Sequence, residues 1–260
     1  MHKHSCDWRQ SETRLHESEI SRASSAEADL TCNGFDSVAD LRIRHGSWLN
    51  PSVRNLPELE LFLRLRLAQP LPGADAQWKF APSPSRKGWR PDDTPATARR
   101  AAALILLYPG EHGPSFPLTV RHDDLPHHPG QISLPGGALD PGEDPAAGAL
   151  REAHEEIGIH SRDVRLIGPM SSLWVVVSNF LVYPFIGITD TRPEFRAHPG
   201  EVAELIEAPV STFTVGSASV GLEDRIRDGM RVRYPYFDVE GHQVWGATGM
   251  ILSEFAELLT

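Results

Sequence analysis

Three glutamates near the middle of the chain have a spacing that could hold a metal ion. Glu152, Glu155 and Glu156 stand at positions i, i+3 and i+4, so a helix would place them on one face. Carboxylates this close repel one another, and a hard divalent cation relieves the repulsion. Mg²⁺ usually takes few protein ligands and completes its shell with water and substrate phosphates. The spacing therefore predicts a metal site for phosphate chemistry, with a solvated acidic helix face as the alternative.

Neighbouring residues could support such a site. Arg151 directly precedes the cluster, and Glu143 lies about two helical turns earlier in the sequence. We predict a Glu143–Arg151 ion pair that pins the preceding loop against the helix and keeps Arg151 from neutralising the carboxylates. Gly136 and Gly137 end a predicted strand, where the missing side chains let the backbone approach a metal or a phosphate.

This segment resembles the Nudix box, G-x5-E-x7-R-E-U-x-E-E-x-G-U, at every fixed position from Gly137 to Ile159. The softest match is Ala153, where the family usually has a larger aliphatic residue. The Nudix family hydrolyses nucleoside diphosphates linked to another group, using Mg²⁺ or Mn²⁺ on an α/β/α sandwich. The resemblance implies metal ligands from Glu152, Glu155, Glu156 and the backbone of Gly136.

The residues before the box resemble the signature of the coenzyme A pyrophosphatase branch, L-L-T-x-R-[SA]-x3-R-x3-G-x3-F-P-G-G. The matching positions are Leu118, Thr119, Arg121, Gly130, Pro135, Gly136 and Gly137. The positions that differ are Pro117, His122, Pro126 and Leu134. The change at Pro126 matters most, because an arginine there could pair with a substrate phosphate and proline has neither charge nor N–H.

Two later segments also resemble this branch. Glu201-Val202 is similar to its E-V element, and Val244-Trp245-Gly246-Ala-Thr248 is similar to its C-terminal I-W-G-x-T segment. The resemblance thus covers residues 98–260. It implies a catalytic set of Glu155, Glu156, Glu201 and Arg151, and substrate contacts from Arg121, His128 and Gly137.

These observations predict metal-dependent hydrolysis of a pyrophosphate bond, with coenzyme A or an acyl-coenzyme A as substrate. A carboxylate would orient or deprotonate the attacking water; Glu155, Glu156 and Glu201 all remain candidates. One alternative is a Nudix pyrophosphatase for ADP-ribose, NADH or another nucleotide. A second is a non-catalytic, nucleotide-sensing Nudix domain, although such domains usually lose a box carboxylate and all are present here.

The elements that must position these residues can be predicted in outline. Asp144 suits an N-cap, Pro145 suits the first helical position and Gly158 suits a helix end, so a helix is predicted within the box. A second helix is favoured over 57–67 because of Pro57, and residues 69–95 are interpreted as a linker or an ordered surface loop. A last helix is expected over 248–259. Strands are expected over 101–108, 116–121, 164–167, 173–177, 180–188, 201–207 and 231–237. The predicted class is α/β, a Nudix-type α/β/α sandwich with a mixed sheet.

Composition narrows the remaining possibilities. The formal charge of −10 disfavours nucleic-acid binding, and no apolar run approaches the length of a membrane span. No secretory signal is visible, so a cytoplasmic protein is expected, and a homodimer is left open. The predicted organisation is a polar, largely disordered extension over residues 1–50, a short helix and Pro-rich linker over 51–97, and the hydrolase domain over 98–260.

Overall fold

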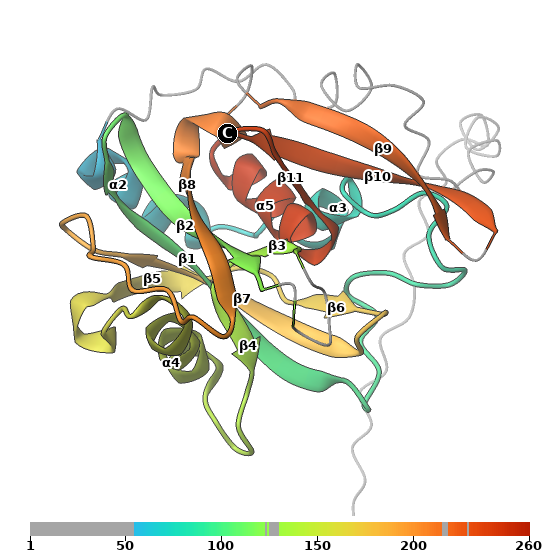
Figure 1. Cartoon of the computed structure of the whole chain (residues 1–260), viewed down its shortest axis with the longest axis horizontal. Helices are drawn as coiled ribbons and strands as arrows, with labels where there is room; N and C mark the ends of the chain where they lie inside the picture. Colours follow the sequence, from blue (N-terminus) through green and yellow to red (C-terminus); the bar gives the residue numbers. More distant parts are fainter. Residues whose placement is uncertain (1–54, 123, 125–129, 215–217, 228) are drawn as a thin grey trace, which may run out of the picture. The chain divides into compact units, whose positions relative to one another are not determined.

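The computed structural model describes residues 55–122, 124, 130–214, 218–227 and 229–260 (Figure 1). The predicted extension over residues 1–50 therefore lies outside the described residues. The described helices are α2 (Leu56–Leu67), α3 (Gly73–Trp78), α4 (Pro145–Ile157) and α5 (Gly246–Leu258). The described strands of the larger sheet are β1 (Arg99–Gly110), β2 (Gly113–Arg121), β3 (Ile132–Ser133), β4 (Gly136–Ala138), β5 (Arg165–Pro169), β6 (Leu173–Val175), β7 (Phe180–Ile188) and β8 (Val202–Pro209).

Strand β1 is the centre of this sheet. It pairs in parallel with β7 and antiparallel with β2 and β4, so the sheet is mixed, as predicted. The strand order is β3-β2-β1-β7-β5, with β4 added on β1, β6 on β7 and β8 on β2. Because β1 and β7 are parallel, the chain must cross over between them, and α4 lies in this connection.

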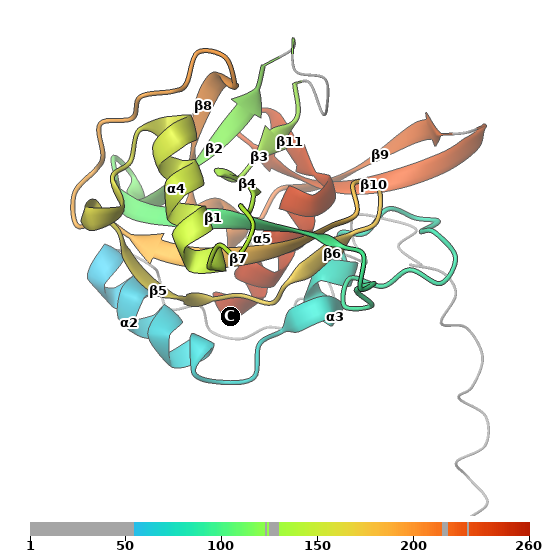
Figure 2. The same ribbon diagram turned by 90° about the horizontal axis from the view of Figure 1, so that it is seen from below.

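Alternating side chains of β1 enter two separate cores. Leu104 and Leu106 are buried among the apolar residues of α4, whereas Ile105 and Leu107 are buried on the other face with residues of α2 and α5. Because successive side chains of a strand point to opposite faces, one strand can seal both layers. Figure 2 shows α4 and α2 on opposite sides of the sheet. The α/β/α sandwich is confirmed.

A second sheet of three strands adjoins this sandwich. It has the order β11-β10-β9, built from β9 (Val220–Arg227), β10 (Met230–Val239) and β11 (His242–Trp245). Phe237 of β10 is buried and stacks on Phe80, with ring centroids 4.1 Å apart. Strands β9 and β11 were not predicted from the sequence.

Residues 69–95 form an ordered segment, as one of the two interpretations held, and are not a linker. They contain α3, and Phe80, Ala81 and Trp89 belong to the main core. Gln77 of α3 is fully buried and donates a hydrogen bond to Glu254 of α5 (2.9 Å). Prolines and glycines here mark the turns between buried residues, so the Pro-rich texture hid an ordered segment that packs into the fold.

The division into domains at residues 50 and 97 stays a prediction. The described residues on both sides of position 97 belong to one compact unit. Within the part of the chain that the structure describes, no helix combines the length and the apolar character needed to cross a membrane.

Candidate active site

Helix α4 carries the glutamates, and local signals determine both of its ends. The Asp144 side chain accepts hydrogen bonds from the backbone N–H groups of Ala146 (2.9 Å) and Ala147 (3.2 Å), and Pro145 occupies the first turn. Gly158 ends the helix in the left-handed region at φ 75°. All three roles were predicted. With Ala149, Ala153 and Ile157 buried against β1, the glutamates lie beside this apolar stripe.

Strand β4 brings glycine backbone against the helix. A Cβ on Gly136 would lie 2.3 Å from the carbonyl oxygen of Ala102 in β1, so only glycine fits between the strands. A Cβ on Gly137 would lie 2.4 Å from Oε2 of Glu152, which shows how closely that carboxylate approaches the strand. The N–H of Gly136 donates a hydrogen bond to Oε2 of Glu156 (3.0 Å). The two glycines therefore let β4 and the carboxylates of α4 meet.

Burial changes the proton affinity of two of these glutamates. Glu156 is only 3% exposed, and its burial raises the pKa to about 7, with the hydrogen bond from Gly136 opposing the shift. Burial also raises the pKa of Glu152, and Arg151 opposes that shift. Nearby Glu201 raises both pKa values further by charge repulsion. The cluster thus concentrates negative charge where water stabilises it poorly.

Arg151 is the only cation that the described residues place in hydrogen-bond contact with this cluster. The predicted ion pair with Glu143 is confirmed: Nε and Nη2 donate to its two oxygens at 2.8 and 3.0 Å. This pair lowers the pKa of Glu143 to about 2. Nη2 also donates to the carbonyl of Ala138 (3.0 Å), which ties the loop to the helix.

The prediction that Glu143 keeps Arg151 away from the metal-binding carboxylates is wrong. Nη1 donates to Oε1 of Glu152 and to Oε2 of Glu155, both at 2.9 Å. The fork of the guanidinium allows one edge to bind Glu143 while the remaining nitrogen bridges the other two carboxylates. Nη1 therefore stands where a cation shared by Glu152 and Glu155 would lie.

Two predicted residues from outside the box lie close to α4. Arg121, at the end of β2, acts electrostatically on Glu156, and its buried Nε has no hydrogen-bond partner among the described residues. Glu201 directly precedes β8, and its carbonyl accepts a hydrogen bond from the N–H of His122 (2.9 Å). The third, His128, lies outside the described residues.

The fold also places His198 at this cluster, which the sequence reasoning missed. Its N–H donates to the carbonyl of Glu156 (2.8 Å), and its Nδ1 lies 4.0 Å from Oε1 of Glu201. The one sequence signal was its place in the turn-forming run His198-Pro199-Gly200, immediately before Glu201.

The donor set suits a hard divalent ion, because every candidate ligand is an oxygen. Within the described ranges, however, no three His, Cys, Asp or Glu side chains converge as a formed metal site. Nη1 of Arg151 instead holds Glu152 and Glu155 in ion pairs. An ion that bound these same two oxygens would compete with Nη1.

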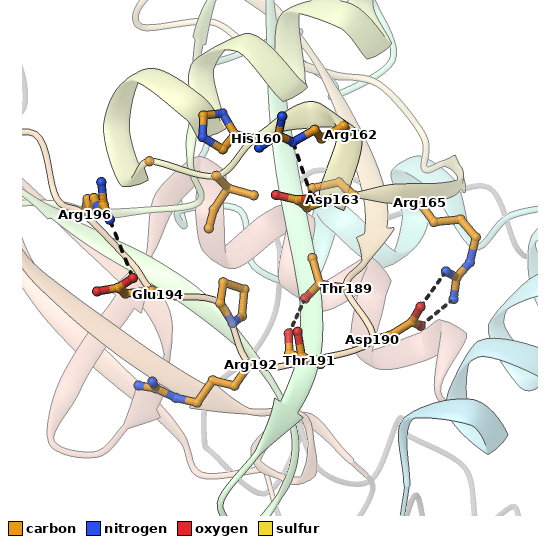
Figure 3. A pocket seen from close by; sticks show the side chains of 14 residues that line it. His160, Arg162, Asp163, Arg165, Thr189, Asp190, Thr191, Arg192, Glu194 and Arg196 are labelled. Carbon is orange, nitrogen blue, oxygen red and sulfur yellow. Dashed lines mark hydrogen bonds and ion pairs between the residues drawn. The ribbon is translucent and has the colours of Figure 1, made fainter.

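A separate cavity of about 640 Å³ lies at the C-terminal end of α4 (Figure 3). Most residues of 158–165 and 189–196 line it, and the charges among them are largely matched. Arg165 pairs with Asp190 at 3.0 Å, and Arg196 faces Glu194 at 3.6 Å. The box glutamates do not line it. The first part of the β7–β8 loop lines the cavity instead, and Glu201 lies at the far end of this loop.

An α/β/α sandwich with clustered carboxylates and an arginine on its crossover helix is suited to metal-assisted phosphate chemistry. Comparison with known proteins agrees. The NUDIX domain family matches residues 97–228. A Nudix hydrolase NudL from Photorhabdus laumondii is 32% identical over 159 residues, covering 61% of this chain and 84% of that protein.

Two further similarities were found. "Nudix hydrolase 15, mitochondrial" of Arabidopsis thaliana is 35% identical over 170 residues, and the match spans 62% of this chain but only 58% of that protein's length. A solved Nudix hydrolase from M. smegmatis, RenU, has 24% identity, covers 42% of this chain and 70% of that one, and gives a TM-score of 0.37.

The chain belongs to the Nudix family. It is a Nudix pyrophosphohydrolase, a class of enzyme that generally uses divalent metal ions and acts on small nucleotide substrates.

Proposed function

We propose that the protein hydrolyses the pyrophosphate bond of coenzyme A or an acyl-coenzyme A with Mg²⁺ or Mn²⁺. The products from coenzyme A are 3′,5′-ADP and 4′-phosphopantetheine. The choice of substrate rests on the resemblance of several segments to the coenzyme A branch, and one contact joins two of these segments. Thr248 Oγ1 donates a hydrogen bond to the carbonyl of Ile132 (3.1 Å), so two segments that resemble the coenzyme A branch, far apart in the sequence, meet in the fold.

The departures from the branch signature have different weights. Leu134 is 4% exposed and packs in the main core, so leucine in place of phenylalanine changes packing there. Pro117 is also buried, within β2. Neither substitution removes a polar group from the ligand-facing surface. His122 is partly exposed at the end of β2, and Pro126 lies outside the described residues.

We assign the following roles to the residues of the site. Glu152, Glu155, Glu156 and the carbonyl of Gly136 hold the divalent ions. When bound, these ions neutralise charge on the phosphate oxygens and lower the pKa of the attacking water. Arg151 would stay paired with Glu143 and would give up its contacts with Glu152 and Glu155 where an ion took the same oxygens.

Substrate contacts come from outside the helix. Arg121, whose buried Nε has no hydrogen-bond partner among the described residues, is the proposed cation for a substrate phosphate. Gly137 is proposed to let the substrate approach its backbone, because it has no side chain. His128 is proposed as a substrate contact from the sequence pattern alone. Glu201 is the proposed carboxylate that orients the water, because it lies near Glu156 without the hydrogen bond to β4 that holds Glu156. Glu155 and Glu156 remain the alternatives for this role.

A second candidate keeps the same chemistry with a different substrate, ADP-ribose or NADH. The proline at position 126 favours it, because a coenzyme A phosphate would lose an arginine partner there. A non-catalytic, nucleotide-sensing role is disfavoured by the complete set of box carboxylates.

A product-resolved chromatographic assay tests the proposal. Purified protein is incubated in Mg²⁺ and in Mn²⁺ with coenzyme A, acetyl-coenzyme A, ADP-ribose, NADH, diadenosine polyphosphates and dGTP. Preferential formation of 4′-phosphopantetheine from coenzyme A supports it. Preference for ADP-ribose or NADH contradicts the coenzyme A assignment, and binding without turnover revives the sensing role.

A further inference from the structure

The loop between β7 and β8 reaches the carboxylate cluster through one histidine. We propose that His198 is a positioning residue that closes the turn before β8 and thereby holds Glu201 against the glutamates of α4. This inference rests on the proposed function, since it assigns Glu201 a part in hydrolysis.

The first part of the loop is anchored away from the cluster. Arg192 pairs with Glu207 of β8, and Glu207 also accepts a hydrogen bond from the buried hydroxyl of Tyr108 (2.9 Å). Phe195 packs edge-on against the same tyrosine, with ring centroids 5.3 Å apart. These contacts fix the course of the loop before it reaches α4.

The loop is then tied to the end of α4 by its backbone. The N–H of Arg196 donates to the carbonyl of Ile157 (2.9 Å), and the N–H of His198 donates to the carbonyl of Glu156 (2.8 Å). The second bond attaches the turn to Glu156, whose side chain accepts a hydrogen bond from Gly136 of β4. A displacement of His198 would therefore also move the backbone of Glu156, on the proposed metal-binding face of the helix.

His198 also closes the turn that follows it. Its carbonyl accepts hydrogen bonds from the N–H groups of Glu201 (3.1 Å) and Val202 (3.0 Å), and its Nδ1 accepts one from Gly200 (3.2 Å). On the opposite side, the carbonyl of Glu201 accepts from His122 of β2 (2.9 Å). Glu201 is thus held between β2 and the turn, with its carboxylate 4.0 Å from Nδ1.

Because Nδ1 acts as a hydrogen-bond acceptor, one substitution can distinguish a positioning role of His198 from a chemical one. Accepting from Gly200 requires Nδ1 without a proton, which places the proton on Nε2. The side-chain oxygen of asparagine accepts hydrogen bonds from the backbone two residues on, so His198→Asn can close the same turn. Alanine has no acceptor. If the imidazole itself reacted, asparagine would not replace it.

The test compares His198→Ala, His198→Asn, Glu201→Gln and Glu155→Gln with the wild type, on coenzyme A in Mg²⁺. His112→Ala, at an exposed histidine in the β1–β2 turn, is the matched control. We expect His198→Ala to lower kcat about 10- to 100-fold with KM changed less than about twofold, and His198→Asn to stay within about threefold of wild type. Amide hydrogen exchange by NMR should show Gly200 exchanging faster in His198→Ala and normally in His198→Asn.

Retention of kcat and of Gly200 protection in His198→Ala would overturn the proposal, as would an equal loss in the asparagine variant. Full activity in Glu201→Gln, when Glu155→Gln is inactive, also overturns it while leaving the proposed function standing. If Glu155→Gln is as active as wild type, the proposed metal chemistry fails; if no coenzyme A is cleaved, the substrate assignment fails. The exchange data still decide in either case whether His198 closes the turn.

Discussion

The burial of Glu156 predicts a pH-dependent stability that one substitution should remove. Its pKa is raised to about 7 in the folded protein, mainly by burial, against a value of 4.5 for an unperturbed glutamate. The folded state therefore holds the proton more tightly than the unfolded state. The associated stability is fully present below pH ~4.5 and is lost as the pH rises through about 7.

The size of this effect follows from the shift. Each pKa unit corresponds to about 1.4 kcal/mol, so the whole loss is about 3 kcal/mol, and most of it falls between pH 5 and pH 8. Glu156→Gln stays neutral and keeps an oxygen that can accept from Gly136. With chelator present, the variant should therefore gain about 2–3 kcal/mol relative to wild type between these pH values.

Denaturant unfolding at pH 5, 6, 7 and 8 measures this difference directly. Glu204→Gln, at an exposed position on neighbouring β8, serves as the control and should keep the wild-type pH dependence. Parallel pH profiles for wild type and Glu156→Gln would refute the assignment of the buried charge.

Three further predictions follow from the contacts of the site. Glu143→Gln frees one edge of Arg151, so kcat should fall about tenfold or Mg²⁺ affinity should weaken, with little change in Tm; a fall in Tm alone would contradict a brace for the site. Gly136→Ala drives a Cβ into the β1 backbone and should cost at least about 2 kcal/mol in denaturant unfolding. Gly137→Ala meets only the movable end of a carboxylate, so it should fold normally and lose activity; equal stability losses in both alanine variants would count against this contrast. Thr248→Val removes the hydrogen bond to β3 and should lower the unfolding free energy by about 1 kcal/mol and raise KM, whereas unchanged KM would separate this contact from substrate binding.

Local signals in the sequence were sufficient for the helix that carries the site. The N-cap at Asp144 and the left-handed end at Gly158 are determined by side chains within one turn, so α4 was predicted closely. The spacing of the glutamates and the Glu143–Arg151 pair likewise depend on positions along one segment.

Features that depend on distant segments could not be predicted in the same way. The contacts of Nη1 of Arg151 depend on how β4 orients the helix and on side-chain rotamers. His198 reaches the site only because the β7–β8 loop crosses the end of α4. Gln77 and Phe80 are buried by α5 and β10, whose sequence positions lie far away. The composition of residues 69–95 therefore favoured a linker, although the segment contains a helix and residues of the main core.

The most direct test of metal-dependent hydrolysis by the α4 carboxylates is the kcat of Glu155→Gln with coenzyme A in Mg²⁺. His154→Gln, an exposed neighbour on the same helix, is the control. The account predicts a loss of at least about 100-fold for Glu155→Gln and none for His154→Gln. Wild-type turnover by Glu155→Gln would contradict it.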